Sequence, residues 1–233
     1  MAFSTINSTG ISLKTVLESR SIPKVFFDIR KDSASLHSHY YISVNGIVDV
    51  QLLELATRTH SQEYLAGLAT CIERDSTVSH ATKLDWRRIK DHGSRLYDPM
   101  KGGRYEIFNE RPIKSELILY CANDLELLPG LFEIYRAKLC SPGKTFWRYM
   151  VSKATADRIK DSWSKYYDGH ASSKVCGPWD SWLVDDGRET WNDDVLMAVK
   201  CGEDLDMNDC WVPLPAIKNK GVPDISTLMA QVK

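Results

Sequence analysis

The stretch Lys24-Val25-Phe26-Phe27-Asp28-Ile29-Arg30-Lys31-Asp32 decides the fold class of this chain. Its Val-Phe-Phe centre is continuously apolar, and such a run is typical of a strand that is buried on both faces in an α/β sheet. The charged residues that follow place a polar loop at the end of this strand. A second short apolar stretch at residues 47–50 comes directly after Gly46 and predicts a further strand.

Helical spacing surrounds the two predicted strands. Helices are predicted at residues 12–19, 33–41, 51–59, 62–74 and 115–139, the last with a kink at Pro129. The alternation of strand and helix indicates an α/β domain over residues 1–140. The pattern changes after residue 140, so residues 141–233 are interpreted as a helical or irregular C-terminal extension of unknown role.

Residues 82–111 combine many charges with aromatic residues and glycine, and they are predicted to form a long loop. Loops of this length are uncommon in compact domains unless they are functional.

Size and composition exclude several classes of protein. The 233 residues are enough for one domain with a sizeable core, and the net charge of −1 gives no global basic field. No apolar stretch approaches the length of a membrane span, and the first residues lack the pattern of a secretion signal, so we expect no membrane association. The six cysteines form no CxxC pair, which favours a reducing compartment, the cytosol or the nucleus.

Tyr120 and Asp124 are four residues apart inside an apolar helical run, so both side chains lie on one face, about one turn from each other. A carboxylate there can hold a divalent cation, and a neighbouring phenol can orient a water molecule. Together with an acidic residue at the end of the first strand, this pair suggests metal-assisted cleavage of a phosphodiester.

Four sequence blocks resemble a known family. They are KVFFDIRKDSASL at residues 24–36, GIVDVQLLELATR at 46–58, LYDPMKGGRYEIFNERP at 96–112 and YCANDLELLP at 120–129. In order and spacing they are similar to the ribonuclease D-like 3′–5′ exonucleases of the DEDD type, tyrosine subclass, and especially to fungal members. The resemblance implies a ribonuclease H-like three-layer fold, two divalent cations (Mg²⁺ or Mn²⁺), and hydrolysis of the 3′-terminal phosphodiester of single-stranded RNA or DNA.

The resemblance also implies roles for three residues. Asp32 matches the aspartate of the second motif, Asp124 matches the metal-binding aspartate of the third motif, and Tyr120 matches the residue that positions the attacking water. The residues by themselves leave alternatives open. Asp32 also fits an N-cap for a helix at residues 33–41, and Tyr120 also fits a core aromatic residue with its hydroxyl at the surface.

The first motif of that family, an Asp-x-Glu on a central strand, has no counterpart in this sequence, since Asp28-Ile29-Arg30 is basic at the third position. We therefore expect a domain without its first strands, in which another segment, a second copy or a partner chain completes the sheet. Two carboxylates do not neutralise two divalent cations. A truncated exonuclease and a catalytically silent module that binds nucleic acid or protein both remain open.

Residues 83–95 combine cations with Trp86, as a groove for single-stranded nucleic acid would. A solvated charged face is the plainer alternative, and the glycine pair at 102–103 is equally explained as a simple turn. The residues that we assign to nucleic-acid binding are Arg87, Arg88, Lys101, Arg104 and Tyr105.

Overall fold

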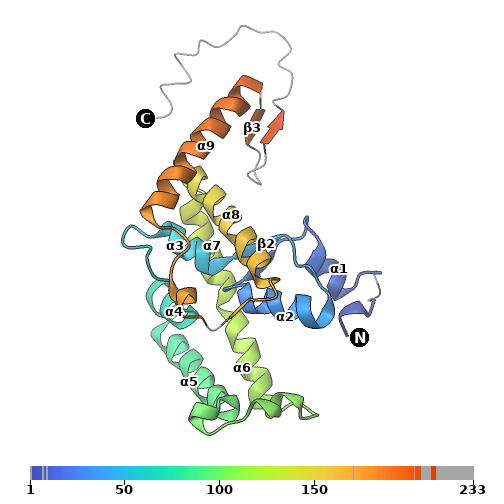
Figure 1. Cartoon of the computed structure of the whole chain (residues 1–233). Helices are drawn as coiled ribbons and strands as arrows, with labels where there is room; N and C mark the ends of the chain where they lie inside the picture. Colours follow the sequence, from blue (N-terminus) through green and yellow to red (C-terminus); the bar gives the residue numbers. More distant parts are fainter. Residues whose placement is uncertain are drawn as a thin grey trace. The chain divides into compact units, whose positions relative to one another are not determined.

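The computed structural model describes residues 2–6, 8, 10–169, 171–201, 203–205 and 211–213 (Figure 1). The chain divides into two compact units, Met1–Val184 and Asp185–Lys233. None of the helices in the described ranges is both long and apolar enough to cross a membrane.

The first unit is mostly helical. Its elements are η1 (Ala2–Ser4), α1 (Leu13–Glu18), β1 (Lys24–Phe26), α2 (Arg30–Tyr40), β2 (Ile47–Asp49), α3 (Val50–Thr57), α4 (Leu68–Asp75), α5 (His80–Tyr97), η2 (Pro99–Lys101), η3 (Tyr105–Asn109), α6 (Ser115–Glu126), α7 (Leu128–Leu139), α8 (Thr145–Ser162) and η4 (Ser172–Val175). Helix α9 (Ser181–Cys201) runs across the boundary, and the second unit also holds β3 (Glu203–Leu205) and β4 (Trp211–Pro213) as an antiparallel pair.

The two strands predicted in the first unit are confirmed, and they pair in parallel. The register joins Lys24 to Ile47, Val25 to Val48 and Phe26 to Asp49. The expectation that β1 is buried on both faces is wrong, since all three of its residues are only half-buried. Within the described part of the first unit this pair is the whole sheet, so the expected three-layer arrangement is reduced to two strands among helices. A two-stranded sheet has no central strand, which explains the partial exposure.

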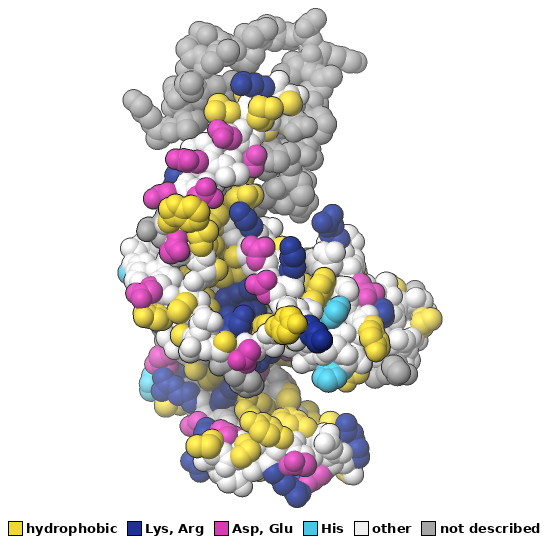
Figure 2. Space-filling model, viewed as in Figure 1, with side chains coloured by type: hydrophobic (Ala, Val, Ile, Leu, Met, Phe, Trp, Pro, Cys, Tyr) yellow, Lys and Arg dark blue, Asp and Glu magenta, His cyan; other side chains and the backbone are white. Residues whose placement is uncertain are grey.

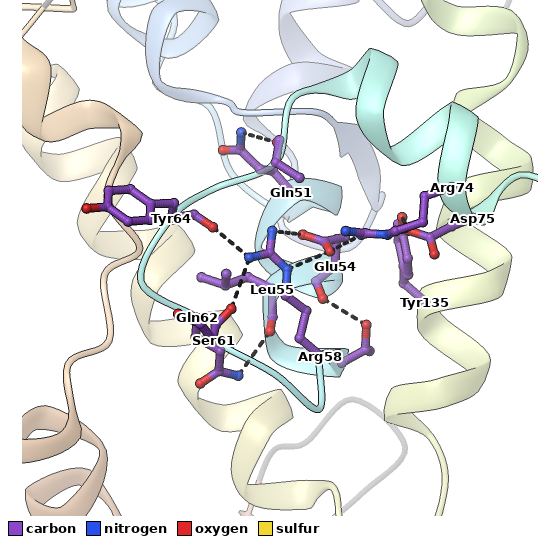
Figure 3. Close-up of polar contacts among 12 residues, drawn as sticks. Gln51, Glu54, Leu55, Arg58, Ser61, Gln62, Tyr64, Arg74, Asp75 and Tyr135 are labelled. Carbon is purple, nitrogen blue, oxygen red and sulfur yellow. Dashed lines mark hydrogen bonds and ion pairs between the residues drawn. The ribbon is translucent and has the colours of Figure 1, made fainter.

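Helix α3 is the centre of the core and is packed by α7 and α8. Its apolar residues Val50, Leu52 and Leu55 are fully buried. Glu54 is also buried, and Figure 3 shows the two arginines that form ion pairs with its carboxylate. The guanidinium of Arg58 donates to both Glu54 oxygens at 2.7 and 2.6 Å, and Arg74 donates to one of them. Buried charges are tolerated when they are paired in this way.

The prediction of a long loop at residues 82–111 is wrong over its first half, where the chain forms α5. The buried or half-buried positions Trp86, Lys90, Gly93 and Tyr97 recur at helical spacing, but the many charges on the other faces mask that period. Helices α5 and α6 pack against each other as a hairpin (Figure 1). Gly93 permits the close approach, because a Cβ at this position would lie 2.4–2.6 Å from side-chain atoms of Tyr120.

The long helix predicted at residues 115–139 is two helices, α6 and α7, which are separated at Leu127. Pro129 stands in the first turn of α7, where a backbone N–H is not needed for the helix. The proline therefore starts a helix and does not kink one.

Candidate functional site

Tyr120 and Asp124 lie together on α6, as their spacing predicts, and both face Lys90 of α5. The Lys90 ammonium donates to both carboxylate oxygens of Asp124 and to the Tyr120 hydroxyl at 3.0 Å. It also lies 4.2 Å from the centroid of the Tyr120 ring, a cation–π distance. Asp124 and Tyr120 are thus already satisfied by a cation of the protein itself.

Aromatic residues enclose the other side of this cluster. The hydroxyl oxygens of Tyr97 and Tyr120 are 2.8 Å apart, and the ring of Tyr97 also packs against Tyr105 and Phe108. Burial, and then the hydrogen bond with Tyr120, raise the pKa of Tyr97 to about 12. Burial likewise raises the pKa of Tyr120. Both phenols therefore stay neutral at physiological pH, and they act here as hydrogen-bonding groups.

A second cluster of carboxylates lies at the ends of β1 and β2. Asp49 is fully buried and accepts hydrogen bonds from the backbone N–H groups of Asp28 (3.0 Å), Ile29 (3.3 Å) and Gln51 (3.1 Å). Arg158 of α8 donates to the same carboxylate at 2.7 Å. Asp49 therefore ties both strand ends and α8 together.

Asp28 has a left-handed backbone, with φ of 60°, and its carboxylate is bonded by Arg30 through two nitrogens at 2.5 and 2.7 Å. Burial pushes the pKa of Asp28 up, but the hydrogen bond and charge of Arg30 and the charge of Arg158 bring it below its ordinary value. Asp28 is therefore a paired anion in this second cluster.

Asp32 belongs to the second cluster. The reading of Asp32 as an N-cap is wrong, because α2 begins at Arg30 and Asp32 lies inside its first turn. Burial, followed by the negative charges of Asp28 and Asp49, raises the pKa of Asp32. Among the described residues no cation forms an ion pair with it.

The donor set does not fit a two-cation site. Within the described ranges no group of three or more histidine, cysteine or acidic side chains is placed to hold a metal ion. Asp124 is occupied by Lys90, and the charges that act on Asp32 come from Asp28 and Asp49. The metal-binding roles of Asp32 and Asp124 and the water-positioning role of Tyr120 stay predictions. Sequence reasoning gave Lys90 no role in the site, and recognising α5 as a helix would have placed this residue on the buried face.

The residues predicted to bind nucleic acid fall on separate elements. On α5, Arg87 pairs with Glu73, and Arg88 lies 3.0 Å from Asp85. After α5, the ammonium of Lys101 donates to the Ser94 hydroxyl at 2.8 Å, the Arg104 guanidinium bonds Glu110 at 2.6 Å, and Tyr105 is 61% exposed. All five are at the surface or in surface pairs, and their contact with nucleic acid stays a prediction.

The exposed side of α5 carries basic residues besides the five residues that we assign to nucleic-acid binding from the sequence. Arg95 and His92 join Arg87 and Arg88 around a hollow of about 470 Å³, which Leu84 and Asp91 complete. We call Arg87, Arg88, His92 and Arg95 the α5 basic face. Figure 2 shows lysine and arginine side chains over this part of the molecule, with acidic side chains between them. A hollow lined by three guanidinium groups is suited to phosphate oxygens.

Comparison with known proteins shows which family the sequence matches and which solved structures are similar to this one. The sequence matches the 3′–5′ exonuclease domain family over residues 7–139. The structure is similar to that of Trypanosoma brucei RNase D in complex with RNA U12, with a TM-score of 0.57, 15% identity and coverage of 76% of this chain and 55% of that chain. It is also similar to the RNase D–GMP complex, with a TM-score of 0.56, 16% identity and coverage of 75% and 49%.

The chain thus spans about half the length of these RNase D chains. At such identities the likeness shows the fold, which is that of ribonuclease H-like exonucleases in a mostly helical form. No curated protein matches the chain.

Proposed function

The chain belongs to the 3′–5′ exonuclease domain family, and we propose that its 233 residues bind single-stranded nucleic acid without hydrolysing it. One observation carries this proposal, the contact of Lys90 with both oxygens of Asp124 and with the Tyr120 hydroxyl. The family resemblance implies that an active exonuclease uses this carboxylate to hold a divalent cation. Here an ammonium group has taken that ligand.

The energetic argument concerns competition for one carboxylate. A divalent cation that binds Asp124 must first displace Lys90, which would leave an ammonium group about two-thirds buried without its partner. Cations of this kind gain their affinity from several oxygen ligands in one place. Asp32, the other predicted ligand, belongs to the cluster of Asp28 and Asp49. A divalent cation at Asp124 therefore gains little binding free energy, and the loss of the contact between Lys90 and Asp124 opposes its binding.

Binding has a separate source in the α5 basic face. Arg95 forms no ion pair within the described residues, and Arg88 is 80% exposed in its side chain, so both guanidinium groups are available to phosphates. The structure of RNase D bound to an RNA supports a nucleic-acid ligand for this fold. We propose single-stranded RNA or DNA as the ligand, held mainly through its backbone.

Within the family we assign the chain to the ribonuclease D-like tyrosine subclass and to its fungal branch, on the Tyr120/Asp124 pair and the four sequence blocks. We further propose residues 1–140 as the exonuclease-like domain, supported by a family match that ends at residue 139, with residues 141–233 as its extension. The five described cysteines are free, which supports a reducing compartment, the cytosol or the nucleus.

The binding half is tested by fluorescence anisotropy with a labelled single-stranded oligonucleotide at rising salt. The double variant Arg88→Gln/Arg95→Gln should weaken binding at least about tenfold. The slope of log affinity against log salt should become shallower by about 1.4, since each phosphate contact contributes about 0.7. Arg136→Gln is the matched control, because Arg136 is exposed on α7 and pairs with Glu133. Equal losses in both proteins would contradict the assignment of the α5 basic face.

The hydrolysis half is tested with a 3′-labelled oligonucleotide in Mg²⁺ or Mn²⁺. We expect no mononucleotide release above that of the Asp124→Asn variant. Release by the parent chain that Asp124→Asn abolishes and Tyr120→Phe reduces would establish a working exonuclease instead. The two halves are independent, so binding without release supports the proposal and release without binding to the α5 basic face rejects it.

A further inference from the structure

Helix α6 exposes an apolar face on the side away from the Lys90 cluster. Ile118 is 56% exposed and Leu125 is 64% exposed, and Cys121 and Ala122 between them are also exposed. We call these four residues the α6 apolar face. Leu117 and Asn123, which lie off this stripe, are buried. The spacing of three, one and three residues places the four exposed side chains along one stripe of the helix.

The sizes of the side chains along this stripe follow the same order from either end of the helix. A large residue stands at each end, Ile118 and Leu125, and two small ones, Cys121 and Ala122, stand at the middle. The midpoint of the stripe lies between the two small residues. A face with this symmetry is complementary to itself when a second copy is turned by 180°, as a two-fold interface requires.

We propose that a second copy of this chain covers the α6 apolar face, as an antiparallel pair of α6 helices related by a two-fold axis near Cys121 and Ala122. The small residues let the helix axes approach to about 8 Å. Ile118 of each chain then packs against the partner's Leu125. This arrangement removes Ile118 and Leu125 from water. Leu119, which is 52% exposed, lies off the stripe and stays outside the interface.

The charges at the ends of α6 select the antiparallel direction. Lys114 stands at the start of the helix, where its ammonium lies 3.7 Å from Glu110 and its side chain is 49% exposed, and Glu126 stands exposed at the end of the helix. In an antiparallel pair each Glu126 lies beside the partner's Lys114 and beside the positive end of the partner's helix dipole. A parallel pair would instead bring the two Glu126 carboxylates together, where they repel each other.

The Lys90 cluster stays outside the proposed interface. Tyr120 and Asp124 project from the side of α6 that packs on α5. Pairing therefore leaves the Lys90 contact and the α5 helix in place, and loss of pairing leaves the proposed binding function in place. The failure of one proposal is thus distinguishable from the failure of the other.

Cysteine oxidation tests the geometry directly. In the antiparallel pair the two Cys121 side chains lie on the same flank next to the two-fold axis, which puts their Cα atoms about 5–6 Å apart, within the range of a disulfide. Oxidation of the full chain with copper–phenanthroline should give a disulfide-linked dimer on a non-reducing gel. Cys121→Ser should abolish that dimer and Cys140→Ser, at an exposed cysteine that ends α7, should not. A dimer that forms equally without Cys121, or no dimer in the parent, overturns the proposal.

The molecular mass of the protein in solution tests the proposed pairing without chemical crosslinking. Light scattering on the eluted parent chain should give about twice the 26.5 kDa of one chain, and Leu125→Arg should return it to one chain. Met100→Arg is the control, because Met100 is 93% exposed and lies outside α6. Glu126→Lys should weaken the dimer, and Lys114→Glu/Glu126→Lys should restore it. A parent that stays a monomer at high micromolar concentration, or a double variant as weak as Glu126→Lys alone, contradicts the antiparallel pair.

Discussion

Two regions of this molecule hold aspartates that are paired with cations of the protein, and the surroundings of the two carboxylates differ. Asp49 at the strand ends is fully buried and is met by three backbone N–H groups and by Arg158. Asp124 on α6 is about one-third exposed and is met by the single ammonium of Lys90. In both places the charge serves contacts within the protein.

The two regions differ in the free-energy cost of burying the charged carboxylate. A fully buried carboxylate must be compensated completely, because the protein interior screens it poorly. A carboxylate that is one-third exposed keeps part of its hydration, so one lysine is enough and the pair is worth less. We therefore expect the cluster of Asp28, Asp32 and Asp49 at the strand ends (the strand-end cluster) to control stability. The cluster of Lys90, Tyr120 and Asp124 (the Lys90 cluster) should control how α6 packs on α5.

The largest effect should come from Arg158→Met, which removes the cation from Asp49 and leaves a buried carboxylate. Breaking such a buried pair costs about 3–5 kcal/mol of unfolding free energy. Denaturation by urea measures this loss. Arg136→Met, which breaks the exposed pair with Glu133, is the control and should change stability by about 0.5 kcal/mol or less. A loss below about 1 kcal/mol for Arg158→Met would remove the contrast between the two regions.

The next effect tests close packing in the Lys90 cluster. Gly93→Ala puts a Cβ within 2.4–2.6 Å of Tyr120 atoms, including its own Cβ, so the helices must separate. We expect a loss of about 1–3 kcal/mol from overpacking. Gly130→Ala in α7 is the matched control, since nothing lies within 4 Å of a Cβ there. That substitution should raise stability by about 0.5–1 kcal/mol through helix propensity. Equal effects at the two glycines would reject the tight α5–α6 contact.

A smaller effect should come from the Lys90 charge itself. Lys90→Met and Asp124→Asn should each cost about 1 kcal/mol, and a double-mutant cycle should give a coupling energy of about 0.5–1 kcal/mol. The value is modest because both side chains are about one-third exposed. Urea unfolding of the four proteins measures it, and raised salt should reduce it. A coupling near zero would show that Lys90 and Asp124 only happen to be neighbours.

Local patterns in the sequence predicted much of the fold. The apolar centre of β1 and the run after Gly46 predicted two strands correctly, because both runs are short, rich in β-branched or aromatic residues and preceded by Pro23 or Gly46. The Tyr120–Asp124 pair was predicted on one helix face by its spacing alone. These features depend on neighbours within a few residues of each other.

Other features depend on residues that are far apart in the sequence. Lys90 reaches Asp124 across 34 positions and Arg158 reaches Asp49 across 109, and no local period announces either partner. The charged residues around Trp86 hid the period of α5, since charge is typical of loops as well as of solvated helix faces. Local patterns also could not predict the extent of the sheet, because a sheet is completed by segments that are distant in the sequence.

The smallest effect is expected at Asp32, the aspartate at the strand ends that forms no ion pair with a cation among the described residues. Burial and the charges of Asp28 and Asp49 raise its pKa in the folded protein above the ordinary 3.8. The folded state therefore holds the Asp32 proton more tightly than the unfolded state. The contribution of Asp32 to stability is most favourable below pH 3.8 and falls as the pH rises through the folded pKa.

Asp32→Asn should accordingly stabilise the protein at pH 7, by about 0.5 kcal/mol, and should leave it unchanged near pH 3, where the aspartate is protonated in both states. Unfolding by urea at several pH values measures the difference between the two proteins, which cancels the titration of the other carboxylates. Asp161→Asn is a suitable control at an aspartate near the end of α8 that is not part of the cluster. A variant that is less stable than the parent at pH 7 would mean that a cation partner holds Asp32. The two clusters would then be alike, each with its carboxylates fully paired.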